Sequence, residues 1–181
     1  KIKSPGPVFF KQERVGKNGK KFKFYKFRTM YLDAEERKKE LMSQNRVKDG
    51  MMFKIEFDER IIGCKKLENG KIKRGLGGWL RRLSIDEFPQ FFNVLKGDMS
   101  LVGPRPYLPR EEEDMGYYYY YITKCKPGIT GLWQVSGRSE LCFDERLELD
   151  LEYYREDVTV LADLGLAAKT VAKTIKKEGA A

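Results

Sequence analysis

A turn cluster between two alternating stretches limits what this chain can fold into. A Gly-Lys-Asn-Gly run at 16–19 separates residues 8–15 from residues 21–27. In the second stretch Phe22 and Phe24 alternate with lysines, which is the period of a strand with one apolar and one basic face. We therefore expect a β-hairpin, in which alternating phenylalanines are more often core than a binding device.

The rest of the sequence favours helices. Periodicity or capping signals predict helices in five further segments: 33–44 (capped by Asp33), 76–83, 111–124, 143–154 and 158–177. Residues 47–73 read as loop with a short strand at most, and three prolines make 102–109 an ordered, non-helical loop. The predicted fold class is α+β, mainly helical with a small antiparallel β-hairpin sheet, in a single domain over 1–181.

The chain contains no histidine. This excludes Ser-His-Asp and Cys-His catalysis and imidazole metal sites, so acid–base or covalent chemistry falls to other side chains. A bound metal would then sit among oxygen ligands, which Mg²⁺, Mn²⁺ and Ca²⁺ prefer. The three cysteines form no metal-binding or paired motif, and they fit a reduced compartment.

The charge balance indicates an anionic partner. Lysine and arginine number 36 against 27 acidic residues, a net charge of +9. Nucleic acid, anionic lipid headgroups and phosphorylated substrates all fit this charge, as does a plain solvated surface. No apolar run reaches the 18 or so residues that would span a bilayer.

Asp86 and Glu87 are the central acidic pair. They lie in Ser-Ile-Asp-Glu, a capping-box pattern before an apolar run at 88–95 that Gly97 would stop. With either Ser84 or Asp86 as the cap, both carboxylates stand at a helix N-terminus, whose partial positive charge keeps them ionised. An ionised aspartate can attack phosphorus. The simpler interpretation is that both residues only cap a helix.

Arginines near this pair could bind phosphate. Arg81 and Arg82 precede the acidic pair, and Arg105 stands between two prolines. The guanidinium fork matches phosphate oxygens, and a restrained backbone suits a preorganised anion contact. The alternative for each is a surface arginine paired with a carboxylate.

Long blocks of the sequence resemble one known family. They are SPGPVF at 4–9, YKFRTM at 25–30, RRLSIDEFPQ at 81–90, FNVLKGDMSLVGPRP at 92–106 and PGITGLWQVSGR at 127–138. Together they resemble the bacterial sugar transferase family, the monotopic polyprenyl-phosphate phosphoglycosyl transferases, over residues 1 to about 157. The last block is most similar to members that start exopolysaccharide, capsule or O-antigen repeat units.

The resemblance implies a two-step, Mg²⁺-dependent transfer of a sugar 1-phosphate. Asp86 would attack the β-phosphate of a UDP-sugar, release UMP and ligate Mg²⁺, with Glu87 as a general base or an orienting group. A polyprenyl (undecaprenyl) phosphate would then take the sugar phosphate. The matching positions for phosphate and substrate binding are Arg81, Arg105, Arg28, Gln134 and Arg138.

The resemblance also places the family's full-length members at the cytoplasmic leaflet of the bacterial inner membrane. In the family a hydrophobic membrane helix precedes the SPGP stretch, so we expect this sequence to be part of a longer protein and soluble by itself. Its segment 158–181 is less apolar than the C-terminal helix of the family. Two alternatives remain, a basic nucleic-acid-binding module and a non-catalytic membrane-surface adaptor; the enzyme hypothesis expects no nucleic acid. The sugar and the oligomeric state, a homo-oligomer included, stay open.

Overall fold

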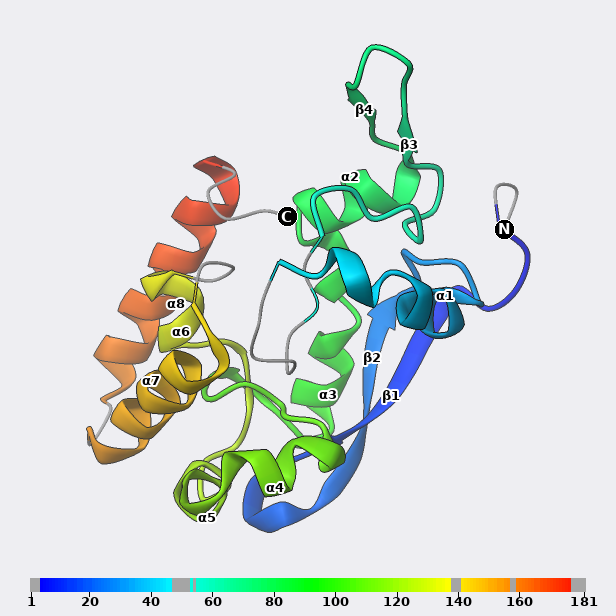
Figure 1. The fold of residues 1–181 in the computed structure, drawn as a ribbon. Helices are drawn as coiled ribbons and strands as arrows, with labels where there is room; N and C mark the ends of the chain where they lie inside the picture. The colour runs from blue at the N-terminus through cyan, green and yellow to red at the C-terminus, as the bar shows by residue number, and fades with distance from the viewer. Residues whose placement is uncertain (1–3, 47–52, 54, 138–140, 157–158, 177–181) are drawn as a thin grey trace.

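The computed structural model describes residues 4–46, 53, 55–137, 141–156 and 159–176, and it places helices around three small pairs of strands (Figure 1). This confirms the α+β class. The strands are β1 (Phe9–Val15), β2 (Lys21–Phe27), β3 (Lys65–Lys66), β4 (Ile72–Lys73), β5 (Ser100–Val102) and β6 (Gly128–Thr130). The helices are α1 (Ala34–Glu40), α2 (Leu76–Arg82), α3 (Gln90–Leu95), α4 (Glu112–Met115), α5 (Tyr117–Ile122), α6 (Leu132–Ser136), α7 (Phe143–Arg155) and α8 (Val160–Lys176).

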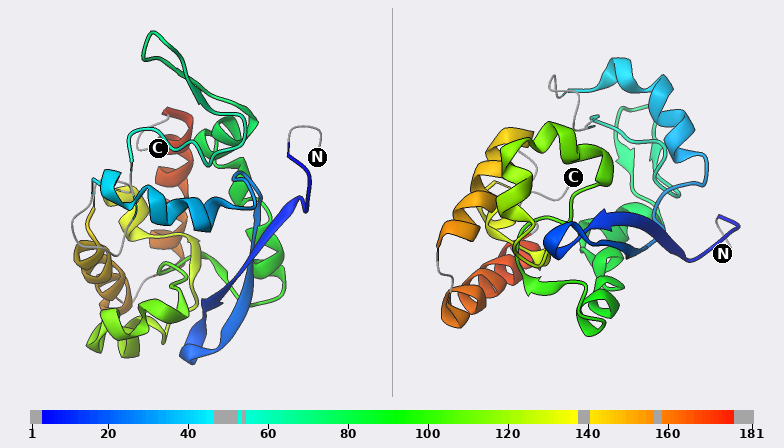
Figure 2. Two further views of the ribbon diagram at one scale, coloured as in Figure 1. Left: turned by 45° about the vertical axis from the view of Figure 1, so that its right-hand side comes forward. Right: turned by 90° about the horizontal axis from the view of Figure 1, so that it is seen from below.

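The predicted hairpin is confirmed. Strands β1 and β2 pair antiparallel from Phe9 opposite Phe27 to Val15 opposite Lys21, and they form a long twisted ribbon beside α3 (Figure 2). Phe22 and Phe24 are buried in a cluster with Met99. Because these two rings are core, they cannot serve as the base-stacking platform that a nucleic-acid module would need.

The parallel pairing of β5 with β6 was not predicted. Ser100 lies opposite Gly128 and Val102 opposite Thr130, so the strands are more than a single antiparallel hairpin sheet. The two backbones approach so closely that a Cβ on Gly128 would lie 2.2 Å from the backbone nitrogen of Gly103. The absence of a side chain at Gly103 and Gly128 therefore permits the pairing of β5 with β6.

Most helix predictions are confirmed, but in the segment 33–44 helix α1 ends at Glu40, a 3₁₀ turn follows at Met42–Gln44, and Asp33 stands at the N-cap without a side-chain cap hydrogen bond. The segment 111–124 is two short helices, α4 and α5, because Gly116 takes a positive φ of 52° between them. Their buried residues Met115 and Ile122 pack with Tyr107 and the first turns of α7. Two two-residue strands, β3 and β4, form a small hairpin that projects from the fold in the segment expected to be mainly loop (Figure 1).

Helix α8 closes the described part of the chain. It contacts α6, β5 and β6, while Leu161, Leu164 and Val171 remain exposed. Across the residues that the structure describes, no helix is both long enough and apolar enough to cross a bilayer.

Candidate active site

Asp86 and Glu87 lie in a 3₁₀ turn, Ile85–Glu87, which we call the acidic turn. The predicted capping box does not form, because Ser84 adopts a left-handed conformation and its side chain makes no cap hydrogen bond. Pro89, which has no N–H, is the N-cap of α3, and Phe88 donates its N–H to Ile85 instead. The two carboxylates therefore precede α3 rather than occupy its first turn.

Asp86 is a buried carboxylate, only 8% exposed. Burial raises the pKa of the Asp86 carboxyl above its usual value, and the charge of Lys26 acts in the opposite direction. Glu87 raises this pKa further, whereas Arg81 lowers it. Desolvation is therefore the largest influence on this carboxyl, and it acts against the ionised form that the predicted helix terminus would favour.

Lys26 and Arg81 supply the positive charge of the acidic turn. The ammonium group of Lys26, on β2, lies 2.9 Å from the carboxylate of Glu87, and both side chains are partly shielded from solvent. Arg81 stands in the last turn of α2, which packs against the acidic turn, while the guanidinium of Arg82 stacks over Trp79. We call Lys26, Arg81, Asp86 and Glu87 the dyad cluster. It can hold an anion beside a nucleophilic carboxylate.

Arg105 lies in a second cluster, on the loop formed by residues 103–108, which we call the proline loop. Its guanidinium is 3.6 Å from the buried carboxylate of Glu111, and Glu111 also accepts a hydrogen bond from the N–H of Leu108. Arg14, on β1, donates to the carbonyl of Pro106 at 2.9 Å. Arg14 and Arg105 thus lie together at the proline loop, beside the carboxylate of Glu111.

The environment of Arg14 is unfavourable for its positive charge. Burial lowers the pKa of Arg14 to about 10, and the positive charge of Arg105 acts in the same direction. Its Nε is buried and has no partner among the described residues. The repulsion between these two guanidinium groups favours an anionic ligand that would relieve it.

Phe24 connects the two clusters. The Lys26 ammonium lies 5.5 Å from the centre of the Phe24 ring, and the Arg14 guanidinium carbon lies 5.3 Å from the same centre. Both cations therefore flank one ring on the core-facing side of the hairpin. The dyad cluster and the proline loop thus sit along a single hairpin, which is a suitable arrangement for a ligand with several phosphates.

The other predicted residues are placed differently. Arg28 donates hydrogen bonds to Ser4, to the carbonyls of Pro5 and Pro7 and to that of Met30, so it anchors the segment before β1. Gln134 donates to the carbonyl of Ile129 at 2.9 Å. Arg138 lies outside the described residues.

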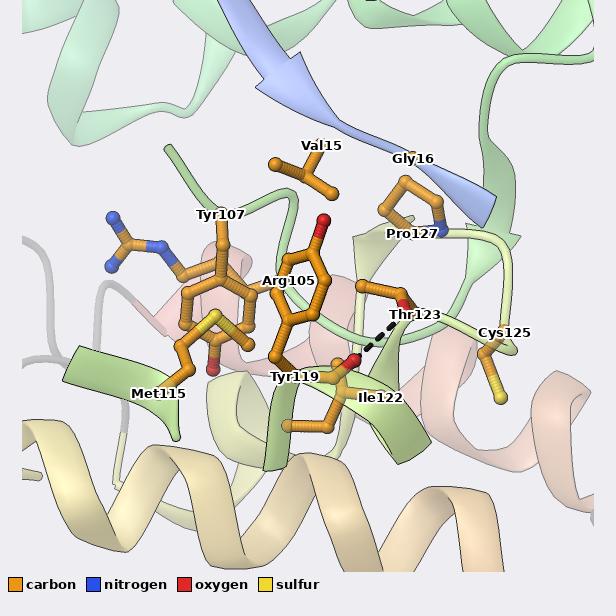
Figure 3. A pocket seen from close by; sticks show the side chains of 10 residues that line it. All are labelled: Val15, Gly16, Arg105, Tyr107, Met115, Tyr119, Ile122, Thr123, Cys125 and Pro127. Carbon is orange, nitrogen blue, oxygen red and sulfur yellow. Dashed lines mark hydrogen bonds between the residues drawn. The ribbon is translucent and has the colours of Figure 1, made fainter. Parts of the chain in front are cut away.

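Two cavities adjoin these residues. The pocket beneath the proline loop, around Tyr107, has a volume of only about 10 Å³ (Figure 3), roughly one water molecule, so it is packed core rather than a substrate site. A larger groove of about 290 Å³ runs beside Arg28 between the segment before β1 and α2. It is lined mainly by apolar side chains, among them Val8, Phe27 and Leu80.

A metal ion would find few protein ligands here. Within the described ranges no three acidic, cysteine or histidine side chains gather as a metal-binding group. Mg²⁺, however, commonly binds through one or two carboxylates and completes its coordination with substrate phosphates and water. The carboxylate of Asp86 fits that pattern, provided that a phosphorylated ligand is present.

Comparison with known proteins identifies the family. The model of the family described as "Bacterial sugar transferase" matches residues 1–177. The chain belongs to the bacterial sugar transferase family. Three curated relatives of this transferase are a galactosyl transferase, CpsE, from Streptococcus agalactiae (48% identical over 85% of the chain), an undecaprenyl-phosphate galactose phosphotransferase from Salmonella typhimurium (39% over 97%) and the exopolysaccharide production protein ExoY from Rhizobium meliloti (36% over 94%).

The matched region is only part of the larger relatives. The transferase chain spans 32% of the streptococcal protein and 35% of the Salmonella protein, about a third of each, but 71% of ExoY. Of these three relatives, the streptococcal and the Salmonella protein are named for galactose, whereas a further relative, from Aeromonas hydrophila, is named for N-acetylgalactosamine. The family resemblance seen in the sequence motifs is thereby confirmed, and the chain is a member of an enzyme family.

Proposed function

We propose that the chain is the catalytic domain of a polyprenyl-phosphate sugar phosphotransferase. It moves a sugar 1-phosphate from a UDP-sugar to undecaprenyl phosphate and so initiates a surface polysaccharide, such as exopolysaccharide, capsule or O-antigen. The observation that carries this proposal is the buried carboxylate of Asp86 between the charges of Lys26 and Arg81. The names of the relatives supply the class of acceptor, undecaprenyl phosphate, and the first donor to test, UDP-galactose.

In the first step a carboxylate oxygen of Asp86 attacks the β-phosphorus of the UDP-sugar. The bond between that phosphorus and the oxygen bridging to the α-phosphate breaks, UMP leaves, and an aspartyl sugar-phosphate remains. Burial of Asp86 strips water from the nucleophile, and Lys26 and Arg81 offset the repulsion between the carboxylate and the phosphates.

In the second step an oxygen of the lipid phosphate attacks the same phosphorus and releases Asp86. Glu87 is held by Lys26 at 2.9 Å, so it can orient that lysine or accept a proton from the incoming lipid phosphate. The groove beside Arg28, whose lining is mainly apolar, would hold the part of the acceptor's apolar chain next to its phosphate. The bond between the sugar and its phosphate stays intact throughout, so the product is a sugar joined to the lipid through a diphosphate.

The proline loop binds the donor phosphates in this proposal. Arg105 and Arg14 are close enough for their charges to repel, and a diphosphate between them would relieve that repulsion. Gln134 and Arg138 remain candidates on the substrate side. Mg²⁺ would be held by Asp86 together with the donor phosphates, and when bound it would neutralise the phosphate oxygens.

A membrane surface is the proposed location of the reaction, on the cytoplasmic leaflet. The exposed apolar side chains support it: Phe88, Phe91, Phe92 and Leu95 on and just before α3, with Trp79 on α2, are each at least about half exposed. Apolar patches of this kind mark interaction sites. Association with a second copy of the chain is an alternative use of the same surface, and sedimentation with and without vesicles distinguishes the two.

Release of UMP tests the proposed function. The protein is incubated with UDP-galactose, undecaprenyl phosphate and Mg²⁺, and UMP is quantified by chromatography, with other UDP-sugars in parallel. We expect UMP from the wild type, none above background from Asp86→Asn, and wild-type amounts from Glu152→Gln, a matched change at an exposed position on α7. A folded wild type that releases no UMP from any UDP-sugar would overturn the proposal.

A further inference from the structure

Asp150 is a fully buried carboxylate that the proposed chemistry does not use. It lies on α7 and is 0% exposed. Its Oδ2 accepts two hydrogen bonds from the proline loop, one from the backbone N–H of Arg105 at 3.0 Å and one from the hydroxyl of Tyr107 at 2.8 Å. Its Oδ1 is buried and has no hydrogen-bond partner among the described residues.

The position is unfavourable for a carboxylate on stability grounds alone. Burial raises the pKa of the Asp150 carboxyl to about 7, even though both hydrogen bonds and the charges of Arg105 and Arg146 oppose the change. A neutral side chain of similar shape would avoid that desolvation cost. The other titratable groups that face Asp150 are Tyr107 and, from the loop after α5, Cys125.

We propose that Asp150 is a positioning residue for Arg105. It fixes the backbone of the proline loop from the helix side, so that the Arg105 guanidinium is aimed at the donor phosphates. This inference rests on the proposed function, because it assumes that Arg105 binds phosphate. Asp150 itself does not touch the substrate.

Other contacts hold the proline loop on either side of Arg105, among them the hydrogen bond from the N–H of Val15 to the carbonyl of Tyr107. The N–H of Gly103 donates to Thr130, the carbonyl of Pro104 accepts from Gly128, and the carbonyl of Pro106 accepts from Arg14. Neither proline has an N–H to donate. The Arg105 N–H is thus the one amide inside the Pro-Arg-Pro triplet, and Asp150 is its acceptor.

The Arg105 side chain has neighbours that restrict its position, but it forms no close ion pair with them. Its guanidinium lies 5.6 Å from the centre of the Tyr107 ring, and in Figure 3 it points away from Cys125 and Pro127. The distance of 3.6 Å to Glu111 is long for a tight ion pair. Loss of the backbone anchor would therefore displace a guanidinium that few other contacts hold.

A kinetic cycle tests the proposal. Asp150→Ala, Arg105→Ala and the double variant are compared with wild type, with Glu152→Gln as the matched control on α7. We expect Asp150→Ala to lower kcat/KM by on the order of 100-fold, as a misplacement of about 1 Å can do, and Asp150→Asn, which keeps an acceptor, to restore most of it. In the Arg105→Ala background, Asp150→Ala should cause no further loss. Additive losses in the double variant would overturn the proposal.

Hydrogen exchange supplies a readout that does not depend on activity. The amide of Arg105 should exchange slowly in the wild type and in Asp150→Asn, and rapidly in Asp150→Ala, while the melting temperatures confirm that all three proteins are folded. An Arg105 amide that remains protected in folded Asp150→Ala would refute the positioning role. Because this result is independent of UMP release, the positioning inference and the proposed function fail separately.

Discussion

Replacing Asp150 by asparagine should change how the stability of the protein depends on pH. In the folded state burial raises the pKa of Asp150 from its ordinary 3.8 to about 7. Between these two values the folded protein holds a proton that the unfolded chain has lost, so ionisation of Asp150 lowers the free energy of unfolding as the pH rises from about 4 to about 7. Above about pH 7 the free energy of unfolding is lowered by the full cost of ionising Asp150 in the folded protein.

The size of the effect follows from the two pKa values. They differ by about three, and each pKa unit corresponds to 1.36 kcal/mol, so the cost of ionising Asp150 reaches roughly 4 kcal/mol as an upper estimate. Asparagine does not ionise. The advantage of Asp150→Asn over wild type should therefore grow with pH and level off above about pH 8.

Urea denaturation at pH 5, 6, 7 and 8 measures this difference directly. Wild type, Asp150→Asn and the control Glu152→Gln are unfolded under identical conditions, and the midpoints are compared at constant m-value. We expect the midpoint of Asp150→Asn to rise relative to wild type across the series, while the control follows wild type. Parallel curves for Asp150→Asn and wild type from pH 5 to pH 8 would refute the reasoning.

Three further changes test the site and the fold. Lys26→Met should raise the pKa of Asp86 further, because the charge of Lys26 opposes the effect of burial. The acid limb of the pH profile of kcat/KM should then move to higher pH, whereas the exposed control Lys23→Met should leave it in place. An acid limb of Lys26→Met that coincides with that of the control would contradict this. Gly128→Ala should impair folding, since its Cβ would lie 2.2 Å from the backbone nitrogen of Gly103, just beyond β5. Gly165→Ala, with no atom within 4 Å of its Cβ, should instead add about 0.5–1 kcal/mol to the free energy of unfolding. Circular dichroism and thermal melts measure both, and a Gly128→Ala protein as stable as wild type would show that the two backbones separate easily.

Local periodicity was enough to predict the elements that depend on local interactions. The hairpin over 8–27 has alternating side chains and a turn cluster, and α7 has a helical pattern, so each was found. The β5–β6 pair could not be found in this way, because two three-residue strands meet only through a close approach of backbones. The break at Gly116 was missed, although a glycine inside a helical pattern can mark the end of a helix.

For the site, the sequence predicted the acidic pair and Arg81, which the structure brings together at the acidic turn. Lys26 and Arg14 were missed. Lys26 continues the buried alternation of Phe22 and Phe24 along β2, and a lysine in a core-facing register is a signal that could have been used. Arg14 stands opposite Phe22 in the same sheet face, a relation that requires the strand register to be known.

The position of a covalent intermediate would be the most direct test of the account. After incubation with UDP-galactose and Mg²⁺ and rapid acid quenching, intact mass spectrometry and peptide mapping would locate any added hexose phosphate. The account predicts a single adduct on Asp86 that disappears when undecaprenyl phosphate is added and does not form in Asp86→Asn. UMP release with no adduct, or an adduct on another residue, would contradict the claim that this buried carboxylate is the nucleophile.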